Sequence, residues 1–230
     1  MRMVADGVWL LDGIVRTPLH PLNVYLVDDV LIDGATRWHY WNIRRDLRGR
    51  KLSMVTLTHC HPDHQGVCKR FCRELGIPLA CHEADVPTME GRRPMLPDNF
   101  LVRRLGWFVS GEPWKVDRVL RDGDIVAGFR VVHTPGHTPG HVVYFRDADR
   151  VAIAGDILSN MSFWTFRPGL YPPPPFFCAD PVQHRRSVEQ LRDLRPKLVL
   201  FGHGPPFTKV EQLDAYVERM QRRELTANVR

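Results

Sequence analysis

Short apolar runs alternate with polar turns along the whole chain. Runs typical of buried strands lie at residues 8–11, 23–27, 30–32, 55–58, 79–81, 125–132, 142–145, 151–154 and 198–201. Helical patterns with recognisable start or stop signals lie at 63–75, before Gly76, at 181–194, after the N-cap Asp180, and from the capping-box residues Thr208 and Glu211 onward. Strands that alternate with helices predict an α/β protein.

Two stretches depart from this alternation. Residues 84–115 carry four prolines around an apolar segment, and we expect an inserted helical excursion that overhangs a site. Residues 160–178 form a loop rich in proline and aromatic side chains. Only one helix, one strand and one helix follow this loop, which is too little for a second core, so residues 1–230 are predicted to form a single domain.

The composition indicates an ordinary globular protein. Hydrophobic residues make up 43% of the chain and charged residues 25%, and no apolar run approaches the roughly 20 residues of a membrane helix. The N-terminal run at 8–11 lies between Asp6 and Asp12 and does not resemble a signal peptide. We therefore expect a soluble, cytoplasmic protein that does not act at a membrane.

The net charge of +6 raises the question of a nucleic-acid partner. The arginines are spread over the chain and cluster only in pairs such as Arg44-Arg45, so the basic run that marks a binding tail is missing. The charge does not favour nucleic acid, and a small-molecule substrate is the expected partner.

Residues 58–64 (THCHPDH) carry four potential metal ligands at the junction of a predicted strand and helix. Imidazole and carboxylate groups suit zinc, iron and manganese. The i, i+2 spacing places His59 and His61 on one side of an extended segment, while Asp63 and His64 turn toward a second point. One stretch can therefore serve two adjacent ions. A solvated, histidine-rich loop is the structural alternative.

Three further motifs follow predicted strands. Residues 133–141 (HTPGHTPGH) follow the strand at 125–132, and their Pro-Gly pairs impose a tight backbone path. Gly155-Asp156 ends the run at 151–154, and residues 202–204 (GHG) end the run at 198–201. In open α/β sheets, ligand-binding sites lie at the carboxyl ends of the strands. We therefore expect these motifs to lie close to residues 58–64.

The motifs HxHxDH, TPGHT, GD and GHG, in this order, resemble the metallo-β-lactamase superfamily over nearly the whole chain. The similarity is greatest to its glyoxalase II and lactonase branch. The resemblance implies a four-layer αβ/βα sandwich with the site at one edge. It also implies two divalent metal ions, zinc by preference and iron or manganese as alternatives. The implied ligands are His59, His61 and His137 for the first ion and Asp63, His64 and His203 for the second, with Asp156 bridging both.

The resemblance implies hydrolysis of an acyl substrate (a thioester, ester or lactone) by a water activated between two cations. Asp63 and Asp156 would be the catalytic carboxylates that tune this charge and accept the proton. Asp33, in a turn that resembles the family's early Asp-Gly turn, would orient a ligand histidine.

Departures from the family patterns limit the substrate assignment. Metallo-β-lactamases usually have cysteine where Asp156 stands. The Gly-Cys-Gly-Arg stretch of glyoxalase II is missing after Asp156, and the tyrosine of the lactonases is replaced by Ser159. Neither the glyoxalase nor the lactonase substrate can therefore be carried over.

The remaining histidines are less favoured as metal ligands. His133 and His141 flank His137 and are less favoured as ligands, because the family pattern selects His137. His20, His39 and His82 lack ligand-like spacing and are expected on the surface or in the core.

We expect the substrate pocket between residues 84–115 and 160–178. Aromatic residues of the two stretches would make the pocket largely apolar: Trp107, Phe108, Phe163, Trp164, Phe166, Tyr171, Phe176 and Phe177. The residues singled out for substrate contact are Trp164, Phe166, Arg167, Tyr171 and His184, with Arg167 available for a carboxylate. Alternatively, the aromatic residues pack the loop onto the core or form a homodimer contact.

Three rival functions remain open at this point. A mononuclear iron dioxygenase of the same fold would use only part of the ligand set. A nuclease of the ribonuclease Z type would need a compact basic surface, and a silent binding module would not need a complete ligand set.

Overall fold

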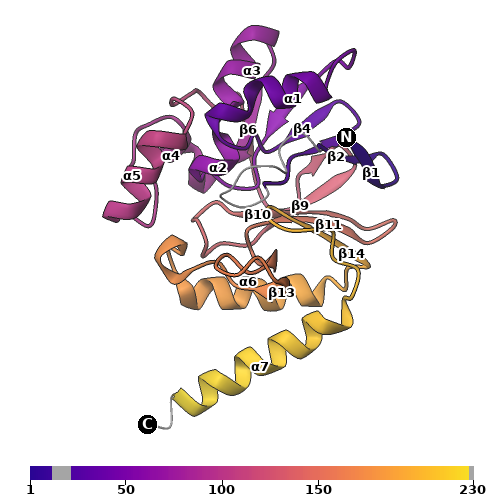
Figure 1. Cartoon of the computed structure of the whole chain (residues 1–230), viewed down its shortest axis with the longest axis vertical. Helices are drawn as coiled ribbons and strands as arrows, with labels where there is room; N and C mark the ends of the chain where they lie inside the picture. The colour runs from indigo at the N-terminus through magenta and orange to yellow at the C-terminus, as the bar shows by residue number, and fades with distance from the viewer. Residues whose placement is uncertain (12–21, 228–230) are drawn as a thin grey trace.

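The computed structural model of the chain describes residues 1–11 and 22–227 (Figure 1). Within them, seven strands form the first sheet, in the order β1 to β7. These strands are β1 (Arg2–Ala5), β2 (Val8–Leu10), β3 (Tyr25–Val27), β4 (Val30–Ile32), β5 (Met54–Thr56), β6 (Leu79–His82) and β7 (Arg118–Leu120). The first four strands are antiparallel, and β4 to β7 run parallel.

In the described part of the chain, the second sheet has five strands in the order β14, β11, β10, β9, β8. Their bounds are β8 (Ile125–Val126), β9 (Phe129–His133), β10 (Val142–Arg146), β11 (Val151–Gly155) and β14 (Leu198–Phe201). The pair β11 and β14 is parallel, so the carboxyl ends of these two neighbouring strands lie at the same end of the sheet.

Helices cover the outer face of each sheet (Figure 1). The first sheet is covered by α1 (Tyr40–Asp46) and α3 (Cys68–Leu75), and the second by α6 (Pro181–Asp193) and α7 (Glu211–Ala227). This is the expected four-layer αβ/βα sandwich. No helix in the described ranges is both long and apolar enough to cross a membrane.

Three apolar cores hold the four layers together, because both faces of each sheet are buried. In β3, Leu26 packs toward the helices while its neighbours Tyr25 and Val27 pack between the sheets. In β9, Val131 joins the core between the sheets and Val132 the core under α6. Successive side chains of a strand point to opposite faces, so these short, nearly continuous apolar runs supply two cores at once.

Two predicted elements are divided in the structure. The helix expected at 63–75 consists of α2 (Pro62–Gln65) and α3, which are separated around Gly66. A Cβ atom at Gly66 would lie 2.3 Å from the backbone nitrogen of Arg37, so glycine lets the chain before α1 pack against this break. The strand expected at 125–132 is the hairpin β8–β9, because Ala127 and Gly128 both adopt positive φ.

The sequence analysis missed α1 and the 3₁₀ helix η2 (Arg37–His39) before it. The stretch 84–115 contains most of η3 (Glu83–Asp85), then α4 (Val86–Met89) and α5 (Phe100–Val109). The loop 160–178 contains most of the hairpin β12 (Ser159–Met161) and β13 (Pro168–Tyr171), and the 3₁₀ helix η4 (Pro175–Phe177). His20 lies outside the described residues.

Candidate metal centre

The metal-binding motifs gather at the carboxyl ends of strands from both sheets. The stretch with His59 and His61 follows β5 and leads into α2, where Pro62 occupies the first helical position. Asp156 directly follows β11, and His203 lies two residues after β14. The β9–β10 loop brings in His137. Segments far apart in the sequence therefore meet at one edge of the sandwich.

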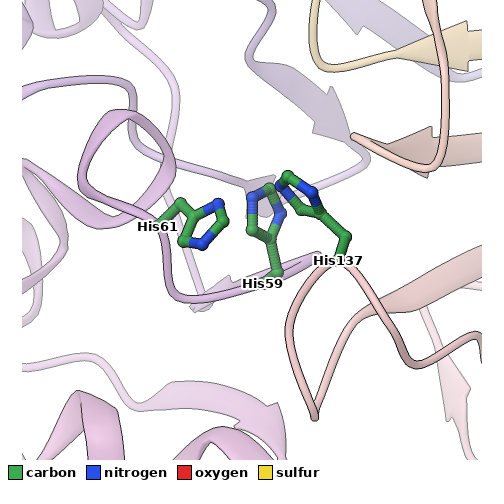
Figure 2. A group of neighbouring side chains, drawn as sticks. All are labelled: His59, His61 and His137. Carbon is green, nitrogen blue, oxygen red and sulfur yellow. The ribbon is translucent and has the colours of Figure 1, made fainter. Parts of the chain in front are cut away.

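A first group consists of His59, His61 and His137, with one nitrogen of each within 4.8 Å of the others. Figure 2 shows the three rings facing one another. The Nε2 atom of His61 lies 2.8 Å from the Leu96 carbonyl, which leaves its Nδ1 for a ligand. The Nδ1 atom of His59 lies 3.1 Å from the Thr58 hydroxyl, which leaves its Nε2. Each of these two rings is thus oriented through its other nitrogen, as metal-binding histidines usually are.

This first group is suited to a cation. The Nε2 atoms of His59 and His137 are buried and have no hydrogen-bond partner among the described residues. Burial is the largest cause that lowers the pKa of both side chains well below 6.5, and neighbouring histidines add to it. Neutral imidazole is the form that binds metals, and an ion would satisfy the unpartnered nitrogens.

A second group consists of Asp63, His64, Asp156 and His203, also with ligand atoms within 4.8 Å. Asp156 lies at its centre, with one carboxylate oxygen 3.3 Å from His64 Nε2 and the other 3.1 Å from His203 Nε2. The second oxygen is also 3.8 Å from His137 Nε2 in the first group. Asp156 therefore lies between the two groups, where a bridging carboxylate would be required.

The charges of the second group favour a cation as well. Burial acts to lower the pKa of His64, but Asp156, Asp33 and Asp63 outweigh it and hold this pKa well above 6.5. Burial acts to raise the pKa of Asp156, but His203 and His64 outweigh it and hold this pKa well below 3.8. Without a metal, protons on the histidines balance the carboxylates. A divalent ion can take their place, and a set of imidazoles and carboxylates suits zinc, iron or manganese.

Asp33 is not a member of the second group, but it orients one of its histidines. Its Oδ2 atom lies 2.9 Å from His64 Nδ1, which leaves Nε2 of that ring for a ligand. The same carboxylate accepts hydrogen bonds from the backbone N–H and the hydroxyl of Thr58, both at 2.8 Å. Asp33 thus fixes both a histidine of the second group and the residue before His59.

A second supporting carboxylate, Asp85, was not predicted from the sequence. This buried side chain accepts hydrogen bonds from Cys60 N at 3.1 Å, Thr138 Oγ1 at 2.9 Å and Gly140 N at 2.7 Å. It therefore ties the loop of His59 and His61 to the loop of His137. Burial raises the pKa of Asp85, and the three hydrogen bonds oppose this rise. Its position shortly after β6 was the only signal in the sequence, since no ligand-like spacing surrounds it.

The histidines flanking His137 belong to neither group. His141 lies with Nδ1 2.8 Å from the Thr134 hydroxyl, and its Nε2 accepts a hydrogen bond from the backbone of Asp156 at 3.2 Å. It therefore orients the backbone of Asp156. His133 stacks on His82 with ring centroids 3.9 Å apart, away from the two groups.

Close packing at the second group requires glycine at position 202. A Cβ atom there would lie 2.2 Å from Asp156 Oδ1 and 2.6 Å from His64 Cε1. The first glycine of the GHG motif thus allows the strand end of β14 to approach both residues.

A cavity of about 270 Å³ opens beside the two groups. Its floor includes His61, Asp63, His137, Asp156 and His203. Its walls are mostly apolar and come from η2, from α5 and from residues 158–177. The excursion at 84–115 thus reaches the site twice, through the walls formed by α5 and through the Leu96 carbonyl on His61.

None of the five predicted pocket residues lines this cavity. The turn between β12 and β13, where Phe166 has a φ of +56°, directs three of them to the surface: Trp164 (70% exposed), Phe166 (49% exposed) and Arg167. Tyr171 and His184 line a separate hollow beside α6 and α7. His184 is held there because its Nε2 lies 2.8 Å from the Ile157 carbonyl. Three other aromatic residues expected at the pocket, Phe108, Phe163 and Phe177, do line the cavity, together with three prolines of the loop.

Comparison with known proteins agrees with this geometry. The sequence model of the metallo-beta-lactamase superfamily matches residues 17–203, so the chain belongs to this superfamily. The probable metallo-hydrolase YflN of Bacillus subtilis is 29% identical over 84% of this chain and 80% of its own length. The hydroxyacylglutathione hydrolase GloC of Haemophilus influenzae is 34% identical, over 46% of this chain and 50% of its own length.

Solved structures show the same fold. The metallo-beta-lactamase family protein TTHA1429 from Thermus thermophilus superposes with a TM-score of 0.71 and 26% identity, over 96% of this chain and 81% of its own. TTHA1623 in a di-iron-bound form superposes with a TM-score of 0.66 and 29% identity, over 85% of this chain and 93% of its own.

Proposed function

We propose that this chain is a metal-dependent hydrolase that uses two divalent ions to cleave an ester, thioester or lactone bond. The observation that carries the proposal is the pair of ligand groups on either side of Asp156, open to an apolar cavity. The relatives named as probable metallo-hydrolases support the hydrolase assignment.

Bound at the two groups, divalent ions would make a water molecule acidic and polarise a carbonyl oxygen. The protein would supply the remaining functions. Asp63 and Asp156 present carboxylate oxygens beside the cavity floor, where one of them can take up the proton of the attacking water. The apolar walls would hold the acyl group and limit the entry of further water.

The identity of the metal ions and the type of acyl bond that is cleaved are part of this proposal. We propose zinc as the metal bound at the two groups. Iron is the alternative, because the structure of TTHA1623 was solved in a di-iron-bound form. The partial similarity to GloC supports a thioester among the candidate bonds, but that similarity spans only half of GloC. A cytoplasmic location and a homodimer stay predictions from the sequence.

Two observations disfavour the rival functions, an iron dioxygenase and a nuclease. A mononuclear iron dioxygenase would need only part of the ligand set, whereas both groups here have converging ligands that are buried or half-buried. A nuclease would need cations near the site, and the described residues that line the cavity include neither lysine nor arginine. Both observations favour an acyl substrate.

The test is proton release, followed with a pH indicator, from the metal-loaded enzyme on thioesters, lactones, aryl esters, β-lactams and phosphodiesters. Metal content is measured in parallel by mass spectrometry. We expect about two metal ions per chain and turnover of one acyl class. The variants His137→Ala and Asp156→Ala should lose this turnover.

His133→Ala is the matched control, since His133 stacks on His82 outside both groups. It should keep full metal content and activity. Turnover of phosphodiesters alone, or binding of one ion per chain with no acyl hydrolysis, would contradict the proposal.

A further inference from the structure

The segments that form the cavity walls also carry exposed aromatic side chains. The walls come from η2, from α5 and from residues 158–177. On one side of the cavity, the ring centroids of Trp38 and Phe108 lie 5.7 Å apart, and both side chains are more than half exposed. On the other side, Phe163 lines the cavity, and the exposed ring of Trp164 lies 5.0 Å from it. Exposed aromatic rings therefore flank the cavity on both sides.

Helix α5 lies at the edge of the molecule, and its outward face is largely apolar (Figure 1). Phe100 and Trp107 are 78% and 79% exposed, whereas Val102 on the opposite face is buried. Arg104 is exposed on the outward face, four residues from both Phe100 and Phe108. Aromatic side chains next to arginine on the exposed side of a helix are typical of helices that lie at a lipid–water interface.

Together, the exposed aromatic residues of the three segments form what we call the rim of the cavity. They are 49% to 79% exposed. A cluster of large apolar side chains on the surface usually marks a site that binds a partner or a membrane. The rim consists of Trp38, Phe100, Trp107, Phe108, Trp164 and Phe166.

The charges near the rim are positive. The three wall segments contain four arginines and no aspartate or glutamate. Arg103 pairs with Asp98, which lies just before α5. Among the residues that the structure describes, no carboxylate forms an ion pair with Arg37, Arg104 or Arg167, and all three arginines are exposed. A complementary partner of the rim must therefore be both apolar and anionic.

These two requirements favour a lipid surface over other partners. A second copy of the chain would place the same rim against itself, so that arginines would meet arginines without carboxylates to balance them. Single-stranded nucleic acid is usually held by a basic groove that follows its backbone, and the rim has more aromatic rings than arginines. An anionic bilayer supplies negative head groups for the arginines and an apolar region for the rings.

We propose that the rim docks this protein onto the surface of an anionic lipid bilayer, with the cavity opening toward the lipid. The aromatic rings enter the head-group region, and the arginines contact phosphate groups. Such a contact needs no membrane-spanning helix, but it departs from the expectation that the protein does not act at a membrane. A compound whose acyl chain lies in the bilayer would then reach the cavity directly. That consequence rests on the proposed hydrolase function, whereas the docking does not.

The first test is co-sedimentation of the full chain, with and without zinc, with vesicles of phosphatidylcholine alone or with about one-third phosphatidylglycerol. We expect binding to the anionic vesicles that weakens as the salt concentration rises. Arg104→Gln should weaken this binding about fivefold. Arg186→Gln is the matched control, because Arg186 is exposed on α6 and its loss changes the net charge equally. It should change the binding by less than about twofold.

A second test separates insertion of the rim from simple adsorption of a basic protein. Tryptophan emission is recorded on anionic vesicles whose phosphatidylcholine carries bromine on its acyl chains, which quenches rings that enter the bilayer. We expect quenching that is reduced in Trp107→Phe and in Trp164→Phe. Trp9→Phe should not reduce it, since Trp9 lies in β2, outside the rim. Trp164→Ser should also weaken vesicle binding, whereas Ile125→Ser, at an exposed position of β8, should not.

Three outcomes would overturn the inference. In the first, Arg104→Gln and Arg186→Gln bind alike and the brominated chains do not quench, as expected for adsorption by net charge. In the second, analytical ultracentrifugation shows a dimer that Trp164→Ser dissociates, so that the rim contacts a second copy. In the third, polyuridylate binds more tightly than the anionic vesicles. No readout requires turnover, so a failure of the proposed function can be told apart from a failure of the docking.

Discussion

Four carboxylates surround the metal centre, and they divide into two kinds. Asp63 and Asp156 belong to the group that can hold an ion, whereas Asp33 and Asp85 bond to the residues around them. Asp85 is the more informative supporting residue, because its hydrogen bonds join two loops that each carry histidines of the first group.

We predict that Asp85→Ala lowers the affinity of the first metal site about 10- to 100-fold, because the loops of His59 and His137 lose their common anchor. Titration against a chromophoric chelator measures this affinity. Glu83→Gln is the control, since Glu83 lies in the same turn but is exposed and paired with Arg121. Equal affinity in Asp85→Ala and Glu83→Gln would show that Asp85 has no positioning role.

We predict that Gly202→Ala displaces Asp156 and His64, because the new methyl group would overlap both. The variant should bind about one ion instead of two and lose most of its activity. Gly106→Ala is the control. A Cβ atom at position 106 would lie no closer than 3.7 Å to any neighbouring atom. Because Gly106 lies in the interior of α5, the substitution to alanine should stabilise the protein by up to about 1 kcal/mol. Metal content and denaturant unfolding report both effects. Two ions retained in Gly202→Ala would refute the packing argument.

The residues of the two groups were visible in the sequence because their motifs are local and each follows a buried strand. Asp85 and His141 were not recognised, because their role depends on which loops meet in space. Trp164, Phe166 and Tyr171 of the loop 160–178 were misplaced for a related reason, whereas Phe163 and Phe177 line the cavity as expected. Which of them faces the cavity depends on the pairing of β12 with β13, and the sequence contains no short-range signal for that pairing.

At the scale of elements, α5 connects the excursion to the cavity. Asn99 caps this helix through a hydrogen bond from Val102 N at 3.0 Å, and its side-chain amide donates to the Phe176 carbonyl at 2.8 Å. One residue thus begins the helix and ties it to η4. Val102 and Phe177, next to these two contacts, both line the cavity.

The two roles of Asn99 can be separated. Asn99→Asp keeps the cap but cannot donate to the Phe176 carbonyl, whereas Asn99→Ala loses both. We predict a loss of about 1–2 kcal/mol in the free energy of unfolding for Asn99→Ala, and a smaller loss for Asn99→Asp. Both variants should raise KM with little change in kcat, because both loosen the cavity wall. An unchanged KM in both would show that the tie to η4 does not shape the cavity.

Element prediction succeeded where a single run belonged to a single element, as for β11 and β14. It failed where tertiary contacts divided a run. The break between α2 and α3 exists because another segment packs against Gly66, and the β8–β9 hairpin depends on two residues with positive φ. Neither feature changes the hydrophobic period on which the prediction relied.

At the scale of the whole molecule, buried neutral histidines link stability to pH. Burial lowers the pKa of His184 to about 4, from 6.5. The unfolded chain therefore binds a proton at this residue more readily than the folded protein does. The stability contributed by the neutral ring is complete above about pH 6.5 and is lost as the pH falls toward 4.

We predict that the metal-free protein loses stability over this pH range, and that His184→Gln loses about 2 kcal/mol less, since glutamine keeps a donor for the Ile157 carbonyl and does not titrate. Denaturant unfolding between about pH 7 and pH 4 measures the difference. Parallel curves for the two proteins would exclude His184 as a source of the acid sensitivity.

The two ligand groups draw their side chains from both halves of the sandwich. The stretch 59–64 follows a strand of the first sheet, while His137, Asp156 and His203 follow strands of the second. A bound ion would therefore join the two sheets in addition to its proposed role in the reaction. Ions at about 100 times their dissociation constant add about 2.7 kcal/mol to stability for each independent site. We therefore expect the metal-free protein to open more often and to be degraded sooner by proteases, so that metal supply would affect the abundance of this protein as well as its activity.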